Sequence, residues 1–127
     1  MRPFGEGSTD LEVYGDEHLL IDFRKQLVLL DQTRITLTRK EFELLALLVR
    51  KAGQIVARRA LLEQVWGYSP EVRTRTLDVH VRRLRKRLGP YASLYIETIF
   101  GMGYRFQPFH APRFQFASGP QALAASA

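Results

Sequence analysis

The sequence predicts an α+β fold in which short strands come first, three helices follow and a β-hairpin comes last. Three observations predict it. Residues 11–37 carry short apolar runs separated by turn residues. Residues 38–88 carry three segments with apolar residues at helical spacing, and residues 95–107 place two further runs around Gly101 and Gly103. With 127 residues, 46% of them hydrophobic, the chain suffices for one domain with its own core.

The early apolar runs predict an antiparallel sheet. They are Leu19 to Phe23, Leu27 to Leu30 and Ile35 to Leu37, with Asp31-Gln32 as one of the turns between them. Each run is too short to form a helix of its own. We therefore expect successive strands from residue 11 to residue 37.

The first helix has a clear start signal. Thr38 and Glu41 have the spacing of a capping box, and Leu37 and Phe42 that of a hydrophobic staple. Gly53 offers a left-handed stop. We expect a helix of about fourteen residues here.

The second helix is expected from Arg58 to Trp66, with Gly67 ending it. Its start is weaker, because Ala57 lacks a side chain that accepts an amide hydrogen bond, a loss of about 1 kcal/mol. Pro70 predicts that residues 68–72 form a loop.

The third helix, at about residues 74–88, separates two faces on a wheel of about 100° per residue. The inward stripe is Leu77, Val81, Leu84 and Leu88. The outward face is basic and consists of Arg75, Arg82, Arg83 and Lys86, with Val79 among them. Asp78 in the first turn favours the helix dipole, and we expect it to pair with Arg75 or Arg82.

The net charge of +6 is concentrated in this helix. Residues 73–87 hold seven basic and one acidic side chain, whereas residues 1–72 hold ten and eleven. A charge run is usually a solvated face, but such faces mix both signs. The segregation here favours a polyanionic partner.

Two helices, a basic helix and a β-hairpin follow the order of a winged helix-turn-helix. The major groove of DNA admits one α-helix and displays donors and acceptors that arginine can read. Val79 could contact a thymine methyl, since a purely electrostatic face would have no use for it; a place at the edge of the core is the alternative. RNA is a weaker candidate, because a helix cannot read the deep, narrow groove of an A-form duplex.

Four separated motifs resemble the effector domain of OmpR/PhoB-type response regulators. They are Leu37-Thr38-Arg39-Lys40-Glu41-Phe42-Glu43-Leu44-Leu45, Trp66-Gly67-Tyr68, residues 74–88, and Thr98-Ile99-Phe100-Gly101-Met102-Gly103-Tyr104-Arg105-Phe106. The resemblance covers about residues 11–107. It implies a four-stranded N-terminal antiparallel sheet, three helices and a C-terminal hairpin wing (about 95–107) that together bind double-stranded promoter DNA and regulate transcription.

The resemblance also implies roles for individual residues. Base contacts are expected from Arg83 and Val79. Phosphate contacts are expected from Arg75, Thr76, His80, Arg82, Arg85, Lys86 and Trp66. The wing contributes Thr98, Phe100, Tyr104 and Arg105. In activators of this family the loop after the second helix meets RNA polymerase, which here implies Tyr68, Ser69, Pro70, Glu71, Val72 and Arg73. A second copy of the chain is expected in tandem on the DNA.

The wing departs from many relatives, which have an arginine at the position of Phe100. Phenylalanine cannot make the salt-sensitive contact that arginine makes in a minor groove. Wing binding should therefore be weaker or rely on apolar wedging. Burial of Phe100 against a neighbouring chain is an equal alternative.

A second departure concerns domain organisation. Residues 1–10 are expected to be a flexible lead-in, residues 11–107 the domain, and residues 108–127 a tail of low order. The aromatic residues Phe109, Phe114 and Phe116 argue for docking of that tail. Nothing in residues 1–36 suits the phosphorylated receiver of a two-component regulator, so the chain is either an excised effector domain or a stand-alone relative.

Other classes of protein find little support. The chain has no cysteine, and its histidines (His18, His80, His110) have no ligand spacing, so we expect neither a metal nor another cofactor. No nucleophile set or nucleotide fingerprint indicates an enzyme. No apolar stretch approaches bilayer length and no signal peptide is present, which predicts a cytoplasmic protein without a membrane partner. The alternative function is a winged helix that binds proteins without specific DNA readout.

Overall fold

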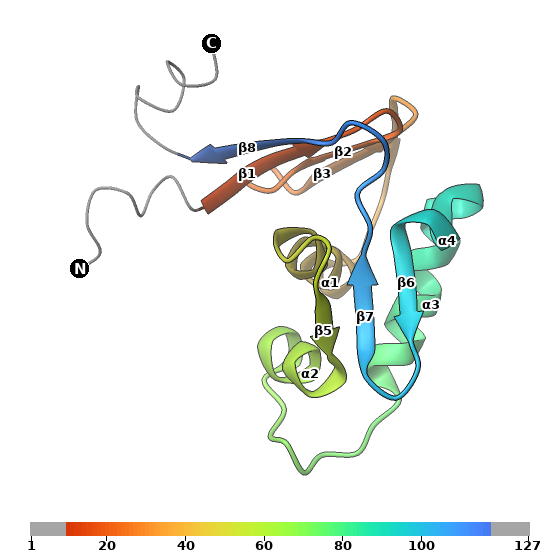
Figure 1. Ribbon diagram of the computed structural model, residues 1–127. Helices are drawn as coiled ribbons and strands as arrows, with labels where there is room; N and C mark the ends of the chain where they lie inside the picture. Colours follow the sequence, from red (N-terminus) through yellow and green to blue (C-terminus); the bar gives the residue numbers. More distant parts are fainter. Residues whose placement is uncertain (1–9, 118–127) are drawn as a thin grey trace. The chain divides into compact units, whose positions relative to one another are not determined.

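The computed structural model describes residues 10–117, and these form two compact units. The first, the sheet unit, comprises residues 10–34 and 110–117. The second, the helical unit, comprises residues 35–109. Figure 1 shows the strands of the first and the helices and hairpin of the second.

The sheet unit consists of antiparallel strands in the order β4-β3-β2-β1-β8. The predicted early strands are present as β1 (Asp10–Gly15), β2 (Leu19–Asp22), β3 (Leu27–Leu30) and β4 (Thr33–Ile35). The last of them begins two residues before the expected run at Ile35, because Asp31 and Gln32 adopt positive φ angles of 49° and 67° and form a tight turn. The buried side chains Tyr14, Ile21 and Val28 lie in register on one face.

The C-terminal segment differs from the predicted tail of low order. Residues Arg113–Ala117 form strand β8, which pairs antiparallel with β1, so the expected four-stranded sheet has a fifth strand. The alternation of Phe114 and Phe116 with polar residues suits a half-buried strand, and the Phe114 ring meets Tyr14 edge-on at 5.1 Å. Phe114 therefore docks on the sheet unit, as expected for an aromatic residue in this segment. Residues 1–9 and 118–127 lie outside the described part, so the lead-in remains a prediction.

Helix α1 (Arg39–Arg50) begins with the predicted capping box. The Glu41 amide donates to Thr38 Oγ1 at 3.2 Å, and the Thr38 amide donates to Glu41 Oε1 at 2.9 Å. The helix has 12 residues and its C-cap is Lys51, so it ends before Gly53. Gly53 instead adopts a φ of 83° and donates its amide to the Phe106 carbonyl.

Helices α2 (Arg58–Trp66) and α3 (Thr76–Leu88) form the helix-turn-helix. Gly67 ends α2 with a φ of 72°, and Ala57 makes no capping bond from its side chain, as predicted. Helix α3 starts two residues later than expected, because the Thr74 hydroxyl accepts the Thr76 amide at 3.1 Å and holds the chain outside the helix.

The predicted wing is present as β6 (Ile96–Ile99) and β7 (Gly103–Phe106). The sequence did not reveal β5 (Ile55–Ala57), a strand of three residues on the other side of β7. Gly103 permits this pairing, since a Cβ there would collide with the Val56 carbonyl. The sequence also missed the short turns η2 (Gly89–Tyr91) and α4 (Ala92–Tyr95) after Gly89 ends α3.

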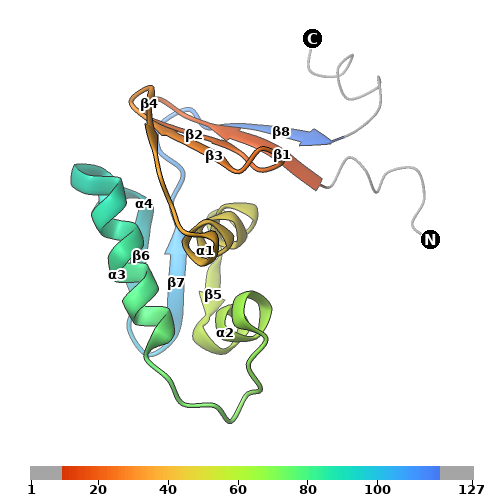
Figure 2. The same cartoon turned by 180° about the vertical axis from the view of Figure 1, so that it is seen from behind.

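The helical unit is held by apolar packing of α1 against α2, α3 and β7. The predicted inward stripe of α3 is buried throughout, at Leu77, Val81, Leu84 and Leu88. Figure 2, from behind, shows α1 in front of β5 and β7 of the same unit, with α3 beside it. None of the helices in residues 10–117 is both long and apolar enough to span a bilayer.

Candidate nucleic-acid interface

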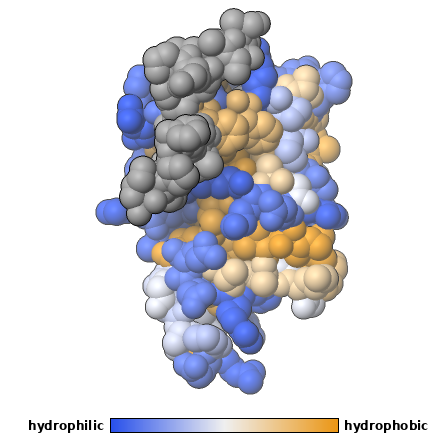
Figure 3. All heavy atoms as spheres, turned by 60° about the vertical axis from the view of Figure 1, so that its left-hand side comes forward, coloured by the Kyte–Doolittle hydropathy of each residue, from blue (hydrophilic) through white to orange (hydrophobic). Residues whose placement is uncertain are grey.

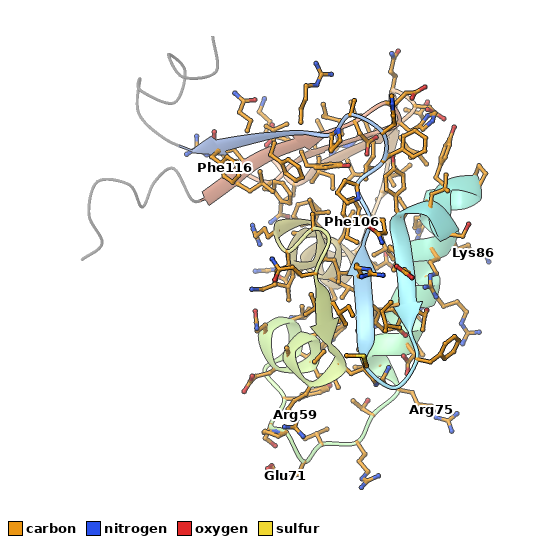
Figure 4. All side chains as sticks on the ribbon, viewed as in Figure 1. Arg59, Glu71, Arg75, Lys86, Phe106 and Phe116 are labelled. Carbon is orange, nitrogen blue, oxygen red and sulfur yellow. The ribbon has the colours of Figure 1, made fainter. Side chains whose placement is uncertain are left out.

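The outward face of α3 carries cations without acidic partners. Arg82, Arg83 and Lys86 are exposed and make no hydrogen bond or ion pair with any described residue. Arg75, at the N-cap, is also exposed. Figure 4 shows Arg75 and Lys86 near opposite ends of the helix, pointing away from α1 and α2. This row of free charge favours an anionic partner that runs along the helix.

Val79 is half-buried, one turn from the exposed cations. It is therefore neither a core residue like Leu77 nor fully solvated. Arg83 lies four residues further on, on the same face of α3. The two residues expected at the bases thus share one side of the helix.

Arg85, expected at a phosphate, is held within the fold. Its Nη2 donates to the Ile96 carbonyl at 3.0 Å and to Thr98 Oγ1 at 2.6 Å. Its guanidinium also lies 5.7 Å from the centroid of the Tyr104 ring. Arg85 therefore anchors α3 to the wing. Unlike the free cations of the outward face, its side chain is bonded within the fold.

Asp78 pairs with Arg58, not with the expected Arg75 or Arg82. Arg58 Nη2 donates to Asp78 Oδ2 at 2.9 Å, and the Tyr104 hydroxyl donates to Asp78 Oδ1 at 2.6 Å. The sequence missed Arg58 because it lies 20 residues away, beyond any helical spacing. These bonds join the start of α2, the first turn of α3 and strand β7.

The charges in this cluster support one another. The hydrogen bonds from Arg58 hold the pKa of Asp78 below its usual value, against the opposing effect of burial, and the bond from Tyr104 adds to the lowering. The same pair raises the pKa of Arg58. Burial, and then the bond to Asp78, raise the pKa of Tyr104. Asp78 is thus ionised in the folded protein at neutral pH.

Three other residues expected at phosphates form a second cluster. The His80 ring packs edge-on against Trp66 at 4.9 Å, and its Nδ1 lies 2.8 Å from the Thr76 carbonyl. All three side chains are half-buried. The contact of His80 with the carbonyl requires a proton on Nδ1, which leaves Nε2 as the ring nitrogen for other partners.

Arg87, at the end of α3, is exposed but lies beside a buried carboxylate of α1. It lies 4.0 Å from Glu41, whose side chain is only 2% exposed. Glu41 therefore serves both the capping box and the docking of α3 on α1.

The loop between α2 and α3 is exposed at Ser69, Pro70, Glu71, Val72 and Arg73, whereas Tyr68 is half-buried. A turn within it is closed by the Val72 amide, which donates to the Ser69 carbonyl at 3.1 Å. In Figure 1 this loop lies at the lower end of the molecule. Figure 3, which is turned about the vertical axis, shows hydrophilic side chains at that end. All six residues expected to face a protein partner thus belong to one surface loop.

Most of the predicted wing residues are engaged within the fold. Arg105 donates to Glu97 Oε1 from Nε at 3.0 Å and from Nη2 at 2.8 Å, and Arg105 is the main cause of the lowered pKa of Glu97. Thr98 and Tyr104 bond to α3. Phe100 alone is free and 90% exposed.

Between residues 10 and 117, no group of three or more His, Cys, Asp or Glu side chains is placed to hold an ion.

A family model described as "Transcriptional regulatory protein, C terminal" matches residues 32–106. Among curated relatives, the transcriptional regulatory protein HprR of Escherichia coli is 42% identical over 100 residues, which are 78% of this chain and 44% of HprR. The probable transcriptional regulator ycf27 of Guillardia theta is 46% identical over 108 residues, 82% of this chain and 42% of the relative. The chain thus spans less than half the length of these relatives.

Solved structures of response regulators resemble this chain as well. The response regulator DrrB of Thermotoga maritima, an OmpR/PhoB homologue, has a TM-score of 0.67 and 38% identity, over 76% of this chain and 44% of DrrB. The RstA DNA-binding domain of Klebsiella pneumoniae, solved in complex with the RstA box, has a TM-score of 0.68 and 33% identity, over 76% of this chain and 97% of that domain. The α+β architecture with its wing is therefore shared with these proteins. The chain belongs to the family of C-terminal domains of OmpR/PhoB-type transcriptional regulatory proteins.

Proposed function

We propose that this chain binds double-stranded promoter DNA in a sequence-specific manner and regulates transcription. The observation that carries the proposal is the outward face of α3, where exposed cations without acidic partners surround the half-buried Val79. Arginine forks suit guanine and phosphate, and an apolar group among them suits a thymine methyl. The bound state of the RstA domain supports the same use of the fold.

The contacts divide into two kinds. Arg83 and Val79 meet base edges in the major groove, while Arg75, Arg82 and Lys86 meet phosphates. Thr76, His80 and Trp66 approach the backbone beside them. Arg85 contributes by fixing α3 to β6, since its guanidinium is already bonded there.

The wing and the loop complete the assignment. The β6–β7 turn lies at the minor groove, and residues 68–73 meet RNA polymerase. A second copy binds in tandem on a repeated site. Binding of promoters implies a cytoplasmic protein, which is either the effector part of a two-component regulator or a stand-alone relative.

The experiment is selection of bound duplexes from a random DNA pool, followed by measurement of stoichiometry. We expect one sequence motif, recovered as two repeats about one helical turn apart and bound by two chains. A triple variant with Arg82, Arg83 and Lys86 changed to alanine should recover nothing. A control with Lys25, Arg34 and Lys51 changed to alanine loses the same charge from other exposed positions and should recover the motif. Failure of the wild type to enrich any sequence would favour a protein-binding role.

A further inference from the structure

The tip of the β6–β7 hairpin is apolar. Phe100 is 90% exposed, the largest exposure of any large apolar side chain among the described residues, and Met102 beside it is 55% exposed. Single apolar side chains on a surface are ordinary. Phe100 and Met102 lie together at one turn, on either side of Gly101, and form a small apolar projection.

This projection is held in place by backbone bonds. Gly101 adopts a φ of 77°, the Met102 amide donates to the Ile99 carbonyl at 2.9 Å, and the Met102 carbonyl accepts the Arg58 amide at 3.1 Å. Arg58 is in turn bonded to Asp78 in the first turn of α3. The tip is therefore fixed to the helix that carries the free cations.

The wing has no free charge with which to bind phosphate. Glu97 and Arg105 are the only charged residues of the hairpin from residue 96 to residue 106, and they pair with each other. The hairpin therefore offers DNA no unpaired cation. Whatever the tip contacts, it contacts through Phe100 and Met102.

The tip also lies at the end of α3 where the row of exposed cations begins. Figures 1 and 2 both show the β6–β7 turn beside the start of α3, and Figure 4 shows Arg75 there. A duplex held by Arg75 and the cations that follow would pass next to this turn. The turn thus places an apolar tip beside the stretch of duplex that flanks the bound site.

We infer that Phe100, supported by Met102, enters the minor groove as an apolar wedge at a flexible pyrimidine–purine step and kinks the duplex there. This inference rests on the proposed function. Apolar side chains inserted between base steps unstack them partially and bend the helix. TA and CA/TG steps yield most easily, so the wedge adds sequence preference at a position that no hydrogen bond reads.

The test uses the whole chain and duplexes selected from the random pool, with dyes at both ends. We expect energy transfer to report a bend of about 20° or more with the wild type. Phe100→Ala should leave the duplex nearly straight and weaken binding about tenfold, with the same salt dependence. Leu94→Ala is the matched control, since Leu94 is 49% exposed on α4, and it should change neither quantity.

A second readout places the wedge. With 2-aminopurine at the flexible step, fluorescence should rise on binding of the wild type and stay low with Phe100→Ala. A straight duplex, or equal bends for the wild type and Phe100→Ala, would overturn the wedge while DNA binding stands. Absence of any bound duplex would overturn both proposals.

Discussion

Arg83 and Arg75 are both exposed arginines of the third helix, yet they should affect binding differently. Arg83→Ala removes a base contact and should relax sequence preference at a cost of about 1 to 3 kcal/mol. Arg75→Ala removes a phosphate contact and should weaken specific and random duplexes alike. Titrations of both variants with a selected and a scrambled duplex measure the loss of affinity for each. Equal losses on the two duplexes for both variants would refute it.

Asp78 should make stability depend on pH. Its pKa is lowered by Arg58, so its stabilising contribution is present above the ordinary carboxyl pKa of about 3.9 and lost as pH falls through the lower folded value. Asp78→Asn should therefore lower the free energy of unfolding at pH 7 by about 1 kcal/mol, a modest value because the pair is half-exposed. Urea denaturation at pH 7 and pH 3 measures this.

The difference in stability between the two proteins should narrow from pH 7 to pH 3, because the unfolded-state carboxyl becomes protonated below about 3.9, and it should close only below the lowered folded pKa of Asp78. Glu63→Gln, a change at an exposed site on α2, controls for loss of one acid. A difference in stability between wild type and Asp78→Asn that is the same at pH 3 as at pH 7 would show that the charge of Asp78 does not stabilise the fold.

At the scale of single residues, the sequence predicted which side chains of α3 point outward but not which of them are bonded. Helical spacing distinguishes the inward Leu77 from the outward Arg82, because both residues belong to one regular helix. The bonds of Asp78 to Arg58 and of Arg85 to Thr98 join elements far apart along the chain. No local pattern predicts such contacts.

Among the elements, the wing offers a gain-of-function test. Phe100→Arg places an unpaired cation at the tip of the hairpin. This variant should bind sites with narrow A-tract minor grooves more tightly. The salt dependence should steepen by about one counterion. Leu94→Arg adds the same charge on α4 and controls for the change in net charge. Unchanged affinity on A-tract sites would contradict the position of the wing at the groove.

Strand β8 should protect the edge of the sheet unit. A chain ending at Phe109 leaves one edge of β1 unpaired and Tyr14 without the Phe114 ring, so its free energy of unfolding should fall by about 1 to 3 kcal/mol. The bare edge should also promote association through strand pairing. Thermal unfolding and sedimentation of both lengths test this.

A matched variant separates the strand from the chain length. The double variant Phe114→Ser, Phe116→Ser keeps the full chain length but removes the alternation of apolar and polar residues in β8. It should resemble the shortened chain in stability. Identical melting of all three proteins would show that β8 contributes nothing.

The elements with strong local signals were predictable, and those without were not. The capping box of α1 and the glycine after α2 are local chemistry, and both are present in the structure. Strand β5 has three residues and depends on the space beside Gly103. Strand β8 depends on β1, about a hundred residues earlier. Pairing of distant strands is a property of the whole chain.

For the molecule as a whole, the uneven charge distribution is the feature that connects sequence to function. Five exposed cations of α3 and the loop before it have no acidic partner bonded to them in the described structure: Arg73, Arg75, Arg82, Arg83 and Lys86. Arg58, Arg87 and Arg105 are paired instead. The sequence predicted the excess, and the structure identifies which charges are available to a partner.

The salt dependence of DNA binding tests the central claim most directly. Each phosphate that the chain neutralises releases counterions, so the logarithm of the binding constant falls linearly with the logarithm of the salt concentration. Four to five available cations predict a slope of about −3.5 to −4.5, and Arg82→Ala should reduce its magnitude by about one. A slope near zero, or one that Arg82→Ala leaves unchanged, would contradict DNA recognition by this face of α3.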